Sequence, residues 1–280
     1  MQKNAPDFIG IGADHCGLNL ITAVLAAHPA VVSTIPAGNF FDTVVYSVDA
    51  LATYEARLPR RTKKARVVGE VSSGYLASPA AAERIVSAYP TTKLFAVVRN
   101  PLDRAVAVYE HAKAAGKVPR QMTCARYLAN HPAVQRGGFY GQHLHSFFEY
   151  YTSLQLHVIV YEDFARDPLK VLQELYAFLE IDATFIPKVL TSYAPPPDEP
   201  KHPGRIYRLI RLIRTLYKKI HPVPFVPATP APYVVSRYFS AKELAAFKVA
   251  YAADCEHLTN LLHRDMGVFW ELKPEVLTAE

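Results

Sequence analysis

Short apolar runs rich in β-forming residues alternate along this chain with longer segments of helical period, which leaves few folds open to it. The expected strands are Phe8–Gly12, Arg66–Gly69, Lys93–Val98 and Leu156–Val160, and the helical segments that follow them are Leu18–Ala27, Ala80–Tyr89, Leu102–Ala115 and Leu169–Leu179. The strand sequences FIGIG, LFAVV and HVIVY are almost continuously apolar, as are strands covered on both faces. The pattern predicts an α/β fold in which a three-layer parallel sheet is flanked by helices.

Length and composition favour one domain over residues 1–280. Half of the 280 residues are apolar, enough to bury one large core and too many for a disordered chain. Lys+Arg 31 against Asp+Glu 25 leaves a net charge of +6, which suits anionic ligands but is too diffuse to predict a nucleic-acid partner. The three cysteines form no CxxC pair, which argues against a disulfide framework and a metal site, and predicts a cytoplasmic location.

Residues 15–41 contain no Asp, Glu, Lys or Arg, a property that membrane spans and signal peptides share. Pro29 and Pro36 interrupt this stretch, and Asn19 and His28 lie within it, so it holds no apolar segment of about 20 residues. We interpret it as the buried first strand-loop-helix unit of a soluble domain.

Two proline-rich stretches, 194–203 and 221–232, depart from the alternation and predict loops. Between them, 205–220 (RIYRLIRLIRTLYKKI) predicts a basic amphipathic helix with a stripe formed by Arg208, Arg211, Arg214 and Lys218. Two interpretations stay open: a packed helix with a solvated charged face, or a peripheral membrane or acidic-ligand contact. The sequence does not predict an oligomeric state.

The loop after the first expected strand, GADHCG, has the GxxxxG spacing of a phosphate-binding loop and stands between a strand and a helix. Its backbone N–H groups and the helix dipole favour an anion, which makes the unit P-loop-like. A nucleoside-triphosphate site needs Lys and Ser/Thr after the second glycine, whereas this chain has Leu18 and Asn19. The loop therefore disfavours a kinase, and a strand-helix turn without a ligand remains the alternative.

Five segments in order resemble the sulfotransferases that use 3'-phosphoadenosine 5'-phosphosulfate (PAPS), most nearly the bacterial and heparan-type branch. They are DFIGIGADHCGLNLITAVLAAHPAV, GEVSSGYL, KLFAVVRNPLDRAVAVYEH, the pair GFYGQHLHSFFEYY and VIVYEDFARDPLKVLQELYAFLEI, and DCEHLTNLLHRDMGVFW. They are similar to the family's 5'-phosphosulfate loop, its "EKSPxYL" segment, its "RNPxDRAxSxY" 3'-phosphate segment, its "YEDL..DP" region and its "LLGRDLxxW" ending. The resemblance implies PAPS as co-substrate, 3',5'-ADP (PAP) as product and no metal.

The resemblance also implies roles for individual residues. Arg99 matches the 3'-phosphate anchor, and Lys201 and Arg205 resemble the basic loop that closes over that phosphate. Glu70 matches the glutamate that acts as general base, and His15 the position that stabilises the leaving group. The loop residues expected to contact the 5'-phosphosulfate are Gly12, Ala13, Asp14, His15, Cys16, Gly17, Leu18 and Asn19.

The chain departs from the family pattern at several of these positions. His15 replaces a lysine, Leu18-Asn19 replaces Thr-Thr, Val71 replaces the lysine after the glutamate, and Ala107 replaces a serine that binds the 3'-phosphate. Losing one such hydrogen bond weakens donor binding by about tenfold. His111, His143 and His145 are weaker candidates; residues two apart on a helix do not share a face, so the HxH pair does not predict a metal site.

These observations favour a sulfotransferase that moves the sulfuryl group of PAPS to a hydroxyl or amine of a small-molecule, lipid or carbohydrate acceptor by in-line displacement. The departures keep open a catalytically dead or repurposed binding module of the same fold. Aromatic residues in 39–41 and 140–151, with the proline-rich loops, are the expected acceptor contacts and favour an apolar or ring-containing acceptor.

Overall fold

Five parallel strands form one sheet in the computed structural model, which describes residues 5–34, 39–44, 46–191 and 234–272. The strands are β1 (Phe8–Gly12), β2 (Val31–Thr34), β3 (Val67–Val71), β4 (Lys93–Val98) and β5 (Leu156–Val160), in the order β2-β3-β1-β4-β5. Every neighbouring pair is parallel. The predicted α/β parallel sheet is confirmed. The bounds of β1, β4 and β5 are those expected, whereas β3 begins one residue after the expected strand Arg66–Gly69 and ends two residues after it.

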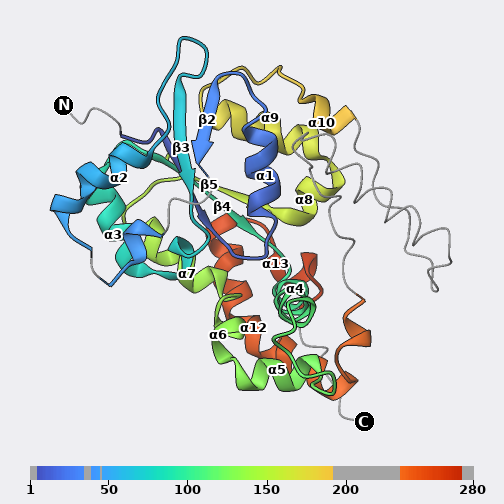
Figure 1. The fold of residues 1–280 in the computed structure, drawn as a ribbon. Coiled ribbons are helices and arrows are strands. Elements are labelled where there is room, and N and C mark those ends of the chain that lie inside the picture. Colours follow the sequence, from blue (N-terminus) through green and yellow to red (C-terminus); the bar gives the residue numbers. More distant parts are fainter. Residues whose placement is uncertain (1–4, 35–38, 45, 192–233, 273–280) are drawn as a thin grey trace.

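Helices cover both faces of this sheet, as predicted for three layers (Figure 1). One face carries α1 (Leu18–Leu25) and α9 (Pro168–Phe178), and the other carries α2 (Leu51–Arg57), α3 (Pro79–Ala88) and α7 (Tyr140–Phe148). The central strand β1 is fully buried, and Phe8, Ile9 and Ile11 have no exposed surface. The core therefore surrounds β1, whose carboxyl end leads into the predicted anion loop.

A second group of helices lies beyond one end of the sheet (Figure 1). It comprises α4 (Pro101–Ala114), α5 (Cys124–Asn130), α6 (Pro132–Arg136), α12 (Ala241–Leu262) and α13 (Met266–Phe269). A separate buried cluster that includes Tyr109, Leu128 and Phe239 packs α4, α5, α6 and the start of α12 together, whereas α13 packs on the main core. The Asp254 carboxylate of α12 accepts the N–H groups of Gly141 and Gln142 at 2.9 and 2.8 Å, which joins α12 to the first turn of α7.

The remaining described elements are short. They are α8 (Tyr161–Arg166), α10 (Lys188–Thr191) and the 3₁₀ turns η1 (Phe40–Asp42), η2 (Val48–Ala50), η3 (Tyr75–Ala77) and η4 (Val235–Arg237). Both proline-rich stretches, the basic segment 205–220, Lys201 and Arg205 lie outside the described residues. No helix in the described ranges is both long and apolar enough to cross a membrane.

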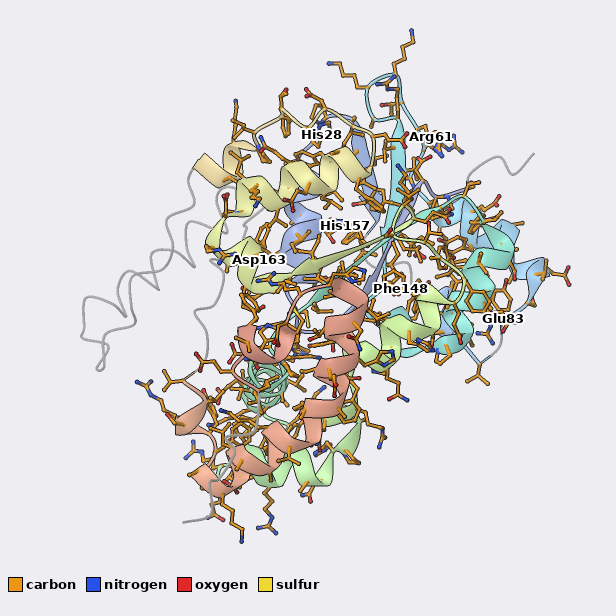
Figure 2. The ribbon with its side chains drawn as sticks, turned by 180° about the vertical axis from the view of Figure 1, so that it is seen from behind. His28, Arg61, Glu83, Phe148, His157 and Asp163 are labelled. Atoms are coloured by element: carbon orange, nitrogen blue, oxygen red, sulfur yellow. The ribbon has the colours of Figure 1, made fainter. Side chains whose placement is uncertain are left out.

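Two carboxylates of α8, those of Glu162 and Asp163, connect parts of the chain that are far apart in sequence. Glu162 accepts the backbone N–H of Asn100 at 2.8 Å with one oxygen and the indole N–H of Trp270 at 3.1 Å with the other. Asp163, labelled in Figure 2, forms an ion pair with Arg264. These contacts hold the start of α4, and with it Arg99, against α8 and α13.

Candidate active site

Two glycines set the shape of the loop between β1 and α1. Gly12 has φ +145°, and a Cβ there would lie 2.7 Å from the Cβ of Leu76. Gly17 has φ +87°, and a Cβ there would lie 2.5 Å from the Tyr161 ring. Larger residues are excluded by both backbone conformation and space, which explains the GxxxxG spacing. The loop is tied to the sheet by the Ala13 N–H, which donates to the Val97 carbonyl at 2.8 Å.

The first turn of α1 presents backbone donors at this edge of the sheet. The N–H groups of Leu20 and Ile21 both donate to the Gly17 carbonyl, so the helical bonds begin there. The N–H groups of Leu18 and Asn19 precede these bonds, where a helix leaves its donors without intrahelical partners and attracts anions. The Leu18 side chain is buried in the core, so this residue offers only its backbone to a ligand.

Two buried arginines bring positive charge to the same loop. Arg99, directly after β4, is 3% exposed, lies 4.9 Å from the Tyr161 ring centre and faces Asp103 at 3.8 Å. Arg104 is 6% exposed and donates from Nε to the Asp14 carbonyl at 3.0 Å and from a terminal nitrogen to the Val134 carbonyl at 2.7 Å. Sequence reasoning missed Arg104, although it stands in the RNPLDRA motif. It fixes the loop backbone while adding charge beside it.

His15 lies at the tip of the loop with φ +60°. Its Nε2 is 3.5 Å from an Asp14 carboxylate oxygen, and its ring centre is 5.2 Å from that of His111 on α4. Burial lowers the pKa of His15; the charges of His111, Arg104 and Arg99 lower it further, whereas Asp14 raises it. The imidazole therefore favours its neutral form near pH 7.

The other predicted loop residues divide between the core and the surface. Ala13 and Cys16 are buried, whereas the Asp14 side chain is 60% exposed. The Cys16 sulfur lies 3.2 Å from the Tyr140 hydroxyl, and burial raises the pKa of the thiol to about 11. Cys16 therefore packs beneath the loop as a protonated thiol, and contributes shape rather than charge to the site.

Glu70, in β3, is completely buried. The Tyr75 hydroxyl donates to its Oε1 at 3.1 Å, while Oε2 makes no hydrogen bond within the described residues. Burial raises the pKa of Glu70 to about 7, opposed by the nearby Tyr54 and Tyr75 hydroxyls and assisted by the charge of Asp42. The carboxyl group thus has the proton affinity of a base near neutral pH, but an acceptor reaches it only if the covering residues move.

The Tyr75 side chain, from η3, contacts Glu70 and links it to the turn at η1. The Tyr75 oxygen that donates to Glu70 also accepts the N–H of Phe41 at 3.3 Å, and the Ser72 hydroxyl donates to the Asn39 side chain. Asp42, half-buried, approaches Gly74 so closely that a Cβ there would lie 2.5 Å from its carboxylate. Sequence reasoning missed Asp42, whose signal was that it is the first acid after the uncharged stretch. The turn brings a second carboxylate toward Glu70.

The two histidines of the HxH pair, His143 and His145, form their contacts away from the loop. His143 Nε2 lies 2.9 Å from the Arg136 carbonyl, and His145 pairs with Glu149 at 3.8 Å. No group of three or more His, Cys, Asp or Glu residues in the described part of the chain is placed to hold a metal. Ala107 is half-buried on α4 and supplies no hydroxyl.

A cavity of about 180 Å³ opens beside the edge strand β5, and it is not built from the predicted site residues. Its lining comprises His157, Val158, Ile159, Val160, Asp163, Val171, Glu174, Leu262 and Arg264. His157 and Asp163 are labelled in Figure 2. We therefore place the site by its chemistry, at the loop and Arg99, and not by this hollow.

The carboxyl ends of β1 and β4 thus bring together a glycine-bounded loop, the first turn of a helix and two buried arginines, the place where open α/β sheets bind ligands. These features define an α/β protein with a P-loop-like anion site. Residues 6–195, more than half of the chain, match the family model for the sulfotransferase domain. The chain belongs to this family, which confirms the resemblance seen in its motifs.

Curated relatives of the matched region act on heparan sulfate according to their names. The chain is 24% identical over 210 residues to the bifunctional heparan sulfate N-deacetylase/N-sulfotransferase of Drosophila melanogaster, covering 63% of this chain and 20% of that protein. It is 27% identical over 192 residues to human heparan sulfate glucosamine 3-O-sulfotransferase 5, covering 65% of this chain and 55% of that protein. The matches span from a fifth to about half of these relatives.

Solved structures show the same fold. The sulfotransferase of Alicyclobacillus acidocaldarius superimposes with a TM-score of 0.69 at 22% identity, covering 95% of this chain and 99% of that one. Mouse sulfotransferase SULT7A1, solved with PAP, superimposes with a TM-score of 0.56 at 17% identity, covering 96% and 89%. The sheet with its P-loop-like unit is therefore a sulfotransferase fold.

Proposed function

We propose that this protein transfers the sulfuryl group of PAPS to a hydroxyl or amine of a carbohydrate or other small acceptor. The observation that carries the proposal is the convergence of the α1 first turn, His15 and the two buried arginines at one edge of the sheet. Anions are stabilised there by backbone donors and by positive charge held away from water. The names of the relatives, and PAP in the mouse structure, support this choice of chemistry.

In the proposed reaction an acceptor oxygen or nitrogen attacks the sulfur atom while the bond from sulfur to the 5'-phosphate oxygen breaks. The electron pair of that bond leaves with PAP, and the acceptor proton passes to a base. Backbone N–H groups of Leu18 and Asn19 and a protonated His15 would stabilise the charge that develops on the leaving phosphate. Arg99 would hold the 3'-phosphate through its guanidinium.

Glu70 is the base that we propose for the acceptor proton. Its support is a pKa of about 7, which suits proton transfer near neutral pH, and its position at the end of β3, next to the Tyr75 hydroxyl that donates to it. Because the carboxyl group is buried, an acceptor that reaches it would have to displace the Tyr75 side chain. The η1 turn is linked to Glu70 through the Tyr75 hydroxyl, so acceptor binding and access to the base are coupled.

The acceptor class rests on two arguments. The two curated relatives described above are named for heparan sulfate, which favours a carbohydrate. Phe40, in the η1 turn, stacks on Tyr54 with the two ring centres 4.8 Å apart. Aromatic rings at this place suit a ring-containing acceptor. Lipid acceptors and contact with a membrane remain hypotheses attached to the basic segment 205–220. The three cysteines are free and buried, which supports the proposed cytoplasmic location.

The test is transfer of labelled sulfate from ³⁵S-PAPS by the whole chain. The acceptor panel contains desulfated heparan oligosaccharides, phenols and alkyl amines. We expect turnover with at least one acceptor, and loss of more than a hundredfold in kcat for Glu70→Gln. Glu83→Gln, an exposed glutamate on α3 labelled in Figure 2, is the matched control and keeps full activity.

Three other outcomes are informative. Full activity in Glu70→Gln would remove Glu70 from the role of base. PAP binding without transfer to any acceptor would support a repurposed binding module of the same fold. Binding of neither PAP nor PAPS would contradict the proposed function altogether.

A further inference from the structure

Two histidines from different elements meet at the anion loop. His15 comes from the loop after β1, and His111 lies in the third turn of α4. Their ring centres are 5.2 Å apart, and the rings meet edge to face at 68°. The His15 side chain is 22% exposed and His111 is exposed, so solvent reaches both rings.

The charges around His15 oppose a proton on its imidazole. Arg104 on α4 and Arg99 at the end of β4 add positive charge from inside the protein, and His111 adds more whenever it is protonated. Asp14, 3.5 Å away, is the acidic group that faces His15, and its side chain is largely solvated. Positive charges held at such distances from a partly buried imidazole oppose its protonation, so His15 favours its neutral form.

We propose that His111 is a positioning residue for His15, and that the His15 imidazole takes up one proton when a phosphate or sulfate ester enters the loop. The inference rests on the proposed function for the identity of the anion. It goes beyond that function by assigning His111 a role and by making donor binding depend on pH. His111 acts through His15 and limits its charge, so the loop gains its full positive charge only with the anion present.

The physical reason is linkage between anion binding and protonation. A phosphate in the loop favours the charged form of His15, so binding takes up a proton wherever the free imidazole is neutral. Affinity then falls by up to tenfold for each pH unit above the midpoint of the His15 titration, the slope expected for one proton. Two independent imidazoles would give a slope approaching a hundredfold.

The first experiment measures PAP affinity by calorimetry between pH 5.5 and 8.5 for the wild type and four variants. The 5'-phosphate of PAP itself titrates near pH 6, so each affinity is divided by that of His15→Gln at the same pH. We expect the wild-type ratio to fall by at most tenfold per pH unit, and the His15→Lys ratio to stay flat below pH 8.5. His111→Phe and His111→Gln should move the wild-type midpoint to higher pH, because a charge that opposes the His15 proton is gone.

The second experiment needs no ligand. Histidine ring resonances of ¹³C-labelled protein report the titration of His15 directly, with His15→Gln used to assign its signal. His111→Phe should raise the His15 midpoint. An unchanged midpoint in both His111 variants, a two-proton slope in the wild type, or loss of PAP binding at every pH in folded His111 variants would overturn the proposal. Failure of PAP to bind any variant, His15→Lys included, would instead contradict the proposed function, while the resonance titration still decides whether His111 acts on His15.

Discussion

At the scale of single residues, Glu70 is a carboxyl group whose protonation is coupled to folding. Its pKa rises from 4.5 to about 7 in the folded protein, so between these values the folded state binds more protons than the unfolded state. The free energy of unfolding therefore decreases as pH rises through this window. The full shift corresponds to a loss on the order of 3 kcal/mol above pH 7.

Glu70→Gln should remove this dependence. We expect the variant to match the wild type near pH 4.5 and to exceed its free energy of unfolding by up to about 3 kcal/mol at pH 8. Urea unfolding at several pH values measures the difference. Glu83→Gln serves as the surface control, and a pH-independent difference for Glu70→Gln would show that the carboxyl group is not coupled in this way.

Ala107 offers a gain-of-affinity prediction. A hydroxyl at this position on α4 would add a hydrogen bond to the 3'-phosphate, worth about 0.5 to 1.5 kcal/mol. Ala107→Ser should therefore lower the Kd for PAP about three- to tenfold, and leave the Kd for 5'-AMP, which lacks the 3'-phosphate, unchanged. Equal effects on both nucleotides would place Ala107 away from the 3'-phosphate.

Sequence reasoning identified residues with a local signature and missed those whose role depends on packing. Gly12 and Gly17 were predictable because tight loops need glycine, and Arg99 because it ends a strand inside a motif. The contact of Arg104 with the Asp14 carbonyl joins residues 90 positions apart, so no local pattern contains it. The complete burial of Glu70 was equally invisible, since a glutamate at a strand end is usually solvated.

At the scale of elements, the turn between α1 and β2 depends on His28 (Figure 2). Its Nδ1 accepts the Ala30 N–H at 3.1 Å, so Nε2 carries the proton that it donates to the Asp182 carbonyl at 3.1 Å. The ring also packs on Tyr176 and Phe185. The imidazole thus fixes the approach of β2 to the sheet and joins it to the end of α9.

His28→Ala should lower the free energy of unfolding by about 3 kcal/mol, from two lost hydrogen bonds and a cavity among aromatic rings. His28→Asn, whose side-chain oxygen can still accept the Ala30 N–H, should recover about 1 kcal/mol of this loss. Urea denaturation measures both variants. Equal losses would show that ring packing alone accounts for the stabilisation.

β2 itself was not predicted, and the reason is physical. It has only four residues, VVST, and it lies within the uncharged stretch 15–41, whose apolar residues hide its boundaries. The longer strands were predictable because burial on both faces makes them continuously apolar. Within residues 15–41, the loop end and α1 match the expected strand-loop-helix unit, whereas β2 and the start of η1 were not expected.

At the scale of the whole molecule, the five motifs are brought together by the sheet and by α8. Glu162 links the start of α4 to Trp270, and Asp163 links α8 to Arg264. The resemblance of five segments, in this order, to the family's motifs was sufficient to predict the family, and the family model confirms it over residues 6–195. The boundaries of a single domain over 1–280, and the roles of Lys201 and Arg205, remain predictions that concern residues outside the described part.

The central claim is that the loop and Arg99 bind a 3'-phosphorylated nucleotide, and thermal unfolding with added ligands tests it most directly. PAP at a hundredfold excess over its Kd should stabilise the protein by about 2.7 kcal/mol. ATP with magnesium should give no comparable stabilisation, because Leu18 is buried in the core and neither it nor Asn19 supplies the lysine and hydroxyl of a triphosphate site. Stabilisation by ATP with magnesium, and none by PAP, would contradict the account.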